Sequence, residues 1–177
     1  LVAARLLEQS PQKQPQFWNR GVSGDRVIDL EARWTDDCLA LEPTVLSILV
    51  GVNDSWHEYS KGPGAGVAVD RYERVLAELI EAARHRFPNL RVLLGEPFVL
   101  RCGAVSDDWF PEFDHRRAAA RRVAEAARAT LVPYQEVFDA AVHKAPPEWW
   151  AVDGVHPTPA GHALMADAWY DALARQS

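Results

Sequence analysis

Hydrophobic positions along the chain follow two patterns, one typical of buried strands and the other of amphipathic helices. The clearest strand is predicted at 44–50, where Thr-Val-Leu-Ser-Ile-Leu-Val is β-branched and apolar along nearly its whole length. Shorter strands are predicted at 17–19, 91–98 and 130–133. A nearly continuous apolar strand is typical of a parallel sheet that is covered by helices on both faces.

Between these strands, apolar residues recur every three or four positions, which predicts helices. The strongest stripe shares one helix face and consists of Val69, Tyr72, Val75, Leu76, Leu79, Ile80, Ala83 and Phe87. Further helices are predicted at about 1–9, 25–41, 113–129, 134–143 and 159–175, with loops at 10–16 and 60–66. Because strands and helices alternate, the sequence predicts an α/β fold built on a parallel sheet.

Composition and charge narrow the class of protein. The chain has 177 residues, 48% of them apolar and 25% charged, with a net charge of −6. This negative balance disfavours nucleic acid and anionic membranes as partners, and an arginine run at 116–128 is interpreted as a solvated helix face. No apolar run approaches the length of a membrane span and no signal peptide is visible, which favours the cytoplasm.

A carboxylate and an imidazole lie close together near the end of the chain, in Asp-Gly-Val-His-Pro-Thr at 153–158. Gly154 and Pro157 disfavour a helix, so we expect a loop followed by a helix that begins near Thr158 or Pro159. In such a loop Asp153 can accept a hydrogen bond from one ring nitrogen of His156 and leave the other nitrogen as a base. A base with its orienting carboxylate is half of an acyl-transfer triad, although a capping Asp beside a surface His is the alternative.

Acyl transfer also needs hydrogen-bond donors for the developing oxyanion. Gly24 can present a backbone N–H with no side chain in the way, and Asn53 carries a side-chain amide at the end of a predicted strand. Each residue has a structural alternative, namely a helix-capping turn for Gly24 and an Asx-turn for Asn53. Both follow predicted strands, where sites of α/β folds gather.

In their order, these segments resemble the sequence blocks of the SGNH hydrolases, also called the GDSL esterase/lipase family. Asn-Arg-Gly-Val-Ser-Gly-Asp at 19–25 resembles the second block, Gly-Val-Asn-Asp at 51–54 the third, and Asp-Gly-Val-His-Pro at 153–157 the fifth. The resemblance implies that Gly24 and Asn53 form the oxyanion hole, that His156 is the base, and that Asp153 orients it. It also implies a three-layer α/β/α, flavodoxin-like fold with a parallel sheet of about five strands.

The family's first block, Gly-Asp-Ser, carries the nucleophilic serine and has no counterpart in this sequence. Ser23 belongs to the second block, Ser47 is in a strand and Ser55 follows the asparagine. The remaining serines have no motif around them: Ser10, Ser60, Ser106 and Ser177. We therefore expect residues 1–177 to be one hydrolase domain that is N-terminally incomplete, without its first strand and with its nucleophile upstream of Leu1.

Aromatic residues give the only indication of a substrate. Trp56 follows the asparagine block and Trp150 precedes the Asp–His loop, so both are candidates for stacking on a sugar ring, although packing of a loop over the core is the alternative. The segments 51–60 and 96–98 resemble the carbohydrate-esterase branch of the family, which removes O-acetyl groups from sugars. The two cysteines, Cys38 and Cys102, have no metal-ligand spacing around them. His57 with Glu58 could be a metal pair, but no third ligand is evident and a solvated pair is the interpretation.

The expected function is that of a cofactor- and metal-independent serine esterase. Its substrate is expected to be a small molecule or oligosaccharide that carries small acyl, above all acetyl, esters. A lipase or thioesterase of the same family, a non-catalytic carbohydrate-binding or scaffold protein on the same fold, and a flavodoxin-like nucleotide binder are the alternatives. The oligomeric state, including a homo-oligomer, stays open.

Overall fold

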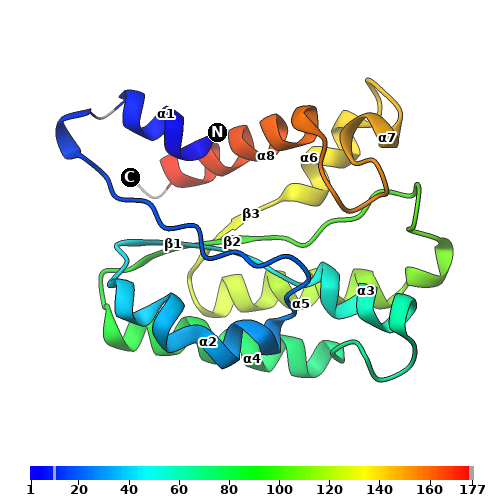
Figure 1. The fold of residues 1–177 in the computed structure, drawn as a ribbon, viewed down its shortest axis with the longest axis horizontal. Helices are drawn as coiled ribbons and strands as arrows, with labels where there is room; N and C mark the ends of the chain where they lie inside the picture. Colours follow the sequence, from blue (N-terminus) through cyan, green and yellow to red (C-terminus); the bar gives the residue numbers. More distant parts are fainter. Residues whose placement is uncertain (10, 176–177) are drawn as a thin grey trace.

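In the computed structural model, which describes residues 1–9 and 11–175, helices pack on both faces of a central parallel sheet (Figure 1). The strands are β1 (Val45–Leu49), β2 (Arg91–Gly95) and β3 (Thr130–Val132). The helices are α1 (Val2–Gln9), α2 (Val27–Asp37), α3 (Val52–Lys61), α4 (Val69–Arg86), α5 (Glu112–Ala126), α6 (Tyr134–Ala141), α7 (Pro147–Trp150) and α8 (Pro159–Ala174). Ser10 and Ser177, two of the serines considered above, lie outside the described residues.

The sheet has the order β1-β2-β3, and both strand pairs are parallel. Val45 of β1 is in register with Arg91 of β2, and Leu93 of β2 is in register with Thr130 of β3. Helices α2, α4 and α5 cover one face, and α1, α6 and α8 lie on the other (Figure 1). The predicted three-layer α/β/α class is therefore confirmed.

Three apolar clusters hold the layers together. One joins the sheet to α2, α4 and α5, and a second joins it to α6 and α8. A third cluster lies beyond the strands and contains Val99, Val105, Trp109, Phe113 and Val155. Because Val155 belongs to the loop of the candidate base, that loop packs on this third cluster.

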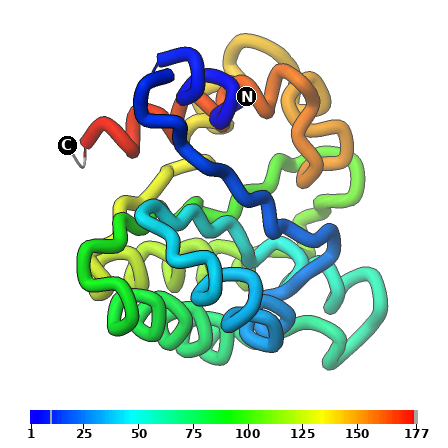
Figure 2. Tube along the Cα trace, turned by 60° about the vertical axis from the view of Figure 1, so that its left-hand side comes forward, coloured from blue at the N-terminus to red at the C-terminus, as the bar shows by residue number. Residues whose placement is uncertain are grey.

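The described residues contain three strands instead of about five, and one predicted strand is wrong. Phe17, Trp18 and Asn19 form coil, and the two aromatic side chains are 42% and 51% exposed. This segment belongs to a stretch that descends from the layer of α1 to the start of α2, past the outer side of β1 (Figure 2). Without a hydrogen-bonded neighbour among the described residues, its apolar side chains do not establish a strand.

The outer edge of β1 is unpaired within the described part of the chain. Val45 and Leu49 are 37% and 47% exposed, so the prediction that this strand is covered on both faces is wrong for the described residues. A groove of about 800 Å³ runs along the strand and is bounded by α1, residues 15–22 and the side chains of Trp169 and Leu173. On this side Ser47 accepts a hydrogen bond of 2.9 Å from Trp169 Nε1 of α8.

The arginine run on α5 is more than a solvated face. Arg116 is fully buried, and its guanidinium donates to Ser55 Oγ at 2.8 Å and to the Val67 carbonyl at 2.6 Å. Arg117 and Arg121 bind the carboxylate of the fully buried Glu96 at 3.2 and 2.9 Å. The expectation of a solvated face was therefore wrong for Arg116, Arg117 and Arg121, whereas Arg122 and Arg128 are exposed as expected. Helical periodicity does not reveal the buried partners, such as Glu96, that need these cations.

Within the described part of the chain, no helix combines the length and the apolar character that crossing a membrane requires.

Candidate active site

Asp153 and His156 face each other across a tight loop between α7 and α8. Nδ1 of His156 lies 2.7 Å from Oδ2 of Asp153, which is hydrogen-bonding distance. The other oxygen, Oδ1, accepts the backbone N–H groups of Val155 at 3.1 Å and His156 at 2.9 Å. The carboxylate is thus held from three directions, and a proton on Nδ1 leaves Nε2 unprotonated and able to act as a base.

Backbone contacts fix the position of this loop. An antiparallel bridge joins Ala151 to Pro157 and closes its base. Residues 100–104, which follow β2, donate to it through Leu100 N to Gly154 O at 2.8 Å and Ala104 N to Asp153 O at 3.0 Å. Gly154 has φ +90, and a Cβ there would lie 2.5 Å from the Leu100 carbonyl oxygen, so only glycine fits this approach.

The electrostatic surroundings keep Asp153 ionised. Partial burial works against its charge, but the hydrogen bonds from the His156 ring and from two backbone N–H groups outweigh burial and hold the pKa of Asp153 below its usual value. A carboxylate that stays charged stabilises the imidazolium that forms when His156 takes a proton.

His156 is open to its surroundings on the side away from Asp153. Its side chain is 72% exposed, and Nε2 makes no hydrogen bond to any residue in the described ranges. The ring of Trp56, from α3, meets it edge-on with centroids 5.9 Å apart. Trp56 in turn packs edge-on against Trp109 of the third apolar cluster at 5.7 Å.

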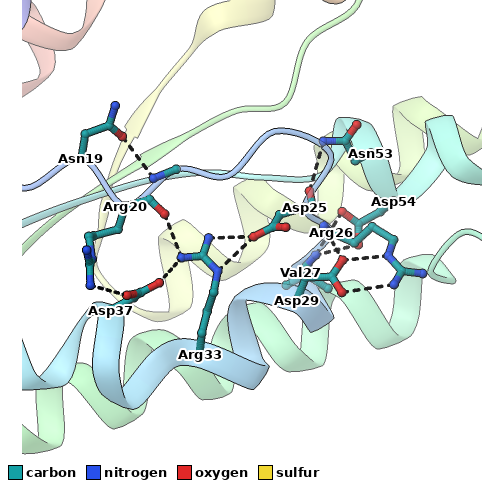
Figure 3. Close-up of polar contacts among 11 residues, drawn as sticks. Asn19, Arg20, Asp25, Arg26, Val27, Asp29, Arg33, Asp37, Asn53 and Asp54 are labelled. Carbon is teal, nitrogen blue, oxygen red and sulfur yellow. Dashed lines mark hydrogen bonds and ion pairs between the residues drawn. The ribbon is translucent and has the colours of Figure 1, made fainter.

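Asn53 lies on the first turn of α3, one helical turn before Trp56. This helix was not predicted from the sequence. The side-chain Nδ2 of Asn53 donates to the backbone carbonyl of Asp25 at 3.1 Å (Figure 3). One amide hydrogen is used by that bond and the second is left for another acceptor. Helix α3 therefore contacts both Asp25, through Asn53, and His156, through Trp56.

Gly24 immediately precedes Asp25 and has φ +87, a conformation that glycine adopts without strain. Its N–H makes no hydrogen bond to any described residue. The space beside its Cα is open, since nothing lies within 4 Å of where a Cβ would be. Gly24 and Asn53, which lie far apart in the sequence, are thus brought near each other through Asp25.

Asp54 is a residue whose importance the sequence pattern did not indicate. Its carboxylate is 1% exposed and accepts the backbone N–H of Val27, at the start of α2, at 3.1 and 3.3 Å (Figure 3). Burial raises the pKa of Asp54 from 3.8 to about 6, against the opposing effects of the Val27 hydrogen bond and the Arg116 charge. Adjacent side chains on α3 thus hold the backbone at Asp25 and Val27.

We expect the pH dependence of stability to change when Asp54 becomes asparagine. Because the pKa of Asp54 is higher in the folded state than in the unfolded chain, its contribution to the free energy of unfolding falls as pH rises from about 4 to about 6. The rise in pKa corresponds to about 3 kcal/mol. The melting temperature of Asp54→Asn relative to wild type should therefore increase between pH 4.5 and pH 7.5.

Asp36→Asn, at an exposed position of α2, is the control and should show no such trend. A difference between Asp54→Asn and wild type that is constant over this pH range would contradict the assignment.

Trp150 has a different set of contacts from Trp56. Its Nε1 donates to the Ala145 carbonyl at 3.1 Å, and its half-buried ring packs against the second apolar cluster. Its own carbonyl accepts the N–H of Thr158 at 2.9 Å, which ties the loop to the start of α8. The structure brings Trp56 to His156, whereas no contact among the described residues joins Trp150 to that ring.

Two of the serines inside the described residues are engaged with other side chains. Ser55 is buried and donates to Glu112 Oε2 at 2.7 Å, and Ser47 accepts from Trp169. No described serine hydroxyl hydrogen-bonds the His156 ring. Likewise, the described residues contain no group of three His, Cys, Asp or Glu side chains arranged for a metal ion.

Comparison with known proteins gives a consistent result. Residues 1–164 match the model of the GDSL-like lipase/acylhydrolase family. An acetylxylan esterase of Geobacillus stearothermophilus is 31% identical over 169 residues, which are 94% of this chain and 76% of that esterase.

Solved structures show the same likeness. A protein of Parabacteroides merdae, named for its likeness to GDSL lipases, is 44% identical with a TM-score of 0.93, over 98% of this chain and 79% of that one. The crystal structure of an acetylxylan esterase from Geobacillus stearothermophilus is 29% identical with a TM-score of 0.87, over 97% and 78% of the two chains. Two catalytic mutants of that esterase have also been solved, one with a serine and one with a histidine replaced by alanine.

Proposed function

Because the chain belongs to the GDSL-like lipase/acylhydrolase family and is thereby a carboxylic ester hydrolase, we propose that it removes small acyl groups, above all acetyl, from carbohydrate esters. The observation that carries the proposal is the 2.7 Å contact between His156 Nδ1 and Asp153 Oδ2. It supplies an oriented base, and α3 contacts both that base, through Trp56, and Asp25 next to Gly24, through Asn53. The acetyl and carbohydrate specificity is supported by the relatives' activity.

In the proposed reaction, Nε2 of His156 takes the proton of a serine hydroxyl while the serine oxygen attacks the ester carbonyl carbon. The carbonyl oxygen becomes an oxyanion that receives hydrogen bonds from the Gly24 N–H and the second amide hydrogen of Asn53. The imidazolium, stabilised by Asp153, then protonates the leaving sugar oxygen as the tetrahedral centre collapses. Water releases the acyl group from serine through the same groups, which regenerates the enzyme.

We propose that the nucleophilic serine is carried by a segment upstream of Leu1, which completes one hydrolase domain with residues 1–177. Two features support this assignment. None of the described serine hydroxyls contacts the His156 ring, and the edge of β1 is open along a groove large enough for further chain. The catalytic mutants of the Geobacillus esterase, one at a serine and one at a histidine, fit a reaction that uses both side chains.

Trp56 is proposed to bound the substrate site. It is half-buried, it lies on the same helix as Asn53, and its ring edge meets the His156 ring. An aromatic ring in this position limits the room for a long acyl chain and offers a surface for a sugar ring. Trp150 is proposed to act indirectly, through the loop that it anchors to α8.

Acyl-chain preference tests this proposal. We expect the full-length enzyme to release acetate from acetylated xylo-oligosaccharides, and to hydrolyse p-nitrophenyl acetate with a kcat/KM about tenfold or more above that for the octanoate. The physical reason is that the Trp56 ring beside His156 limits the room for additional methylene groups. Equal or faster turnover of the long-chain ester would instead indicate a lipase of the same family, and faster turnover of an acyl thioester would indicate a thioesterase.

A further inference from the structure

We propose that Arg33 is a positioning residue for the oxyanion hole, because it holds the Gly24–Asp25 turn in the place where Asn53 meets it. The inference rests on the proposed function, since it presumes that Gly24 and Asn53 are the oxyanion donors. Arg33 lies on α2 and does not itself reach the base, so its effect is transmitted through Asp25.

The Gly24–Asp25 turn is the end of the segment 20–25, and the guanidinium of Arg33 contacts this segment at both ends (Figure 3). Its Nη1 donates to the backbone carbonyl of Arg20 at 2.8 Å. Its Nε and Nη2 donate to Oδ2 of Asp25 at 3.0 and 2.7 Å. Nη1 also binds Asp37 on the same helix, which fixes the guanidinium to α2.

Asp25 links this guanidinium to the proposed donors through two different atoms. Its side chain is held by Arg33, and its backbone carbonyl accepts from Asn53 Nδ2 at 3.1 Å. The Gly24 N–H belongs to the residue immediately before Asp25 in the same turn. A displacement of Asp25 would therefore move one proposed donor and release the other from its acceptor.

Besides Arg33, the side chains of Asn53 and Asp54 hold the end of the segment 20–25, and the Arg20–Asp37 ion pair holds its beginning. Residues 14–22 have no regular secondary structure, and the turn's own backbone bond, from Asp25 N to Val22 O, is long at 3.3 Å. The side chains of Arg33 and Asp25 are only 25% and 19% exposed, so water weakens their contact less than it weakens a surface pair. Hydrogen bonding to Asp37, and then to Asp25, raises the pKa of Arg33 despite its partial burial, so its charge persists at any working pH.

The consequence for activity follows from geometry. Oxyanion donors act only when they are aligned with the developing charge, and small displacements around a reacting centre are costly to the rate. In the full-length enzyme we expect Arg33→Met to lower kcat about tenfold or more while KM changes little, because the donors act in the transition state. Arg33→Lys keeps the positive charge but replaces the several donors of the guanidinium by one ammonium nitrogen. Its kcat should therefore lie between those of Arg33→Met and wild type.

A matched control is available on the same turn. The Arg20 side chain pairs with Asp37 at 2.6 Å and points away from the Asp25 carboxylate (Figure 3). Arg20→Met therefore removes an ion pair beside Arg33 but leaves the contacts between Arg33 and the turn, and its kcat should stay close to that of wild type. A loss of kcat in Arg20→Met equal to that in Arg33→Met would overturn the proposal.

A double-mutant cycle with Asn53→Ala separates positioning from general stability. If Arg33 acts through the oxyanion hole, Arg33→Lys and Arg33→Met should lower kcat less in the Asn53→Ala background than in wild type. The same fold-loss in both backgrounds would overturn the proposal, while the proposed function would stand as long as Asn53→Ala alone is impaired. An Asn53→Ala enzyme with full activity would refute the proposed oxyanion hole, and the role of Arg33 with it.

Discussion

Replacing His156 by alanine is expected to lower kcat of the full-length enzyme by about 10²–10⁴-fold, the usual contribution of a positioned general base. The reason is structural: His156 has one ring nitrogen held by Asp153 and the other free at an exposed edge. With its imidazole removed, the serine would have to lose its proton to water. Steady-state hydrolysis of p-nitrophenyl acetate measures the loss, with circular dichroism to show that the fold is retained.

His162→Ala is the matched control for this experiment. His162 is an exposed histidine on the first turns of α8, close to His156 in the sequence but outside its loop. Its replacement should leave kcat close to the wild-type value. Similar losses in the two variants, or a loss in His156→Ala of less than tenfold, would exclude His156 as the base.

Replacing Asn53 by alanine should be the next most damaging change, with a loss in kcat of about 10²–10³-fold. Alanine keeps α3 intact because it favours helices, but it removes the amide that both bonds Asp25 and offers a second hydrogen to the oxyanion. KM should change little, since the bond to the oxyanion forms only as the transition state is approached.

Asn89→Ala, in the exposed turn after α4, provides the control and should behave as wild type in the same assay. If Asn53→Ala loses less than tenfold in kcat while its melting temperature is unchanged, Asn53 has no place in the mechanism. If the variant loses activity only in proportion to a loss of folded protein, its role is structural.

Local interactions explain why part of the site could be predicted from the sequence. Asp153 and His156 are three residues apart, and Gly154 and Pro157 restrict the backbone between them, so their pairing follows from local geometry. Strands β1, β2 and β3 could also be predicted from the sequence, because their apolar runs are short and bounded by turns. The catalytic roles remain predictions until the variants above are measured.

Helix α3 could not be predicted because the residues that it buries are polar. Asp54 and Ser55 are both 1% exposed and lie against Arg116 and the start of α2, so no apolar stripe marks the helix. Such a buried network depends on partners distant in the sequence. The same holds for Arg33, whose contacts with the turn at 20–25 need the folded arrangement of α2.

The sequence was misleading where apolar residues occur without a partner strand. Phe17 and Trp18 suggested a strand by composition, but a strand also needs a neighbour to share its backbone hydrogen bonds, and the described residues provide none. The contacts of residues 100–104 with Asp153 and Gly154 could not be predicted, because backbone hydrogen bonds carry no side-chain signature.

The open edge of β1 has a practical consequence for work with residues 1–177 in isolation. An unpaired strand edge presents free backbone donors and acceptors, and such edges recruit strands from other molecules and promote aggregation. Here the edge borders a groove flanked by the exposed Val45, Leu49 and Trp18, which adds apolar surface to the same side. We therefore expect the chain to aggregate through this edge more readily than a protein in which a further strand covers β1.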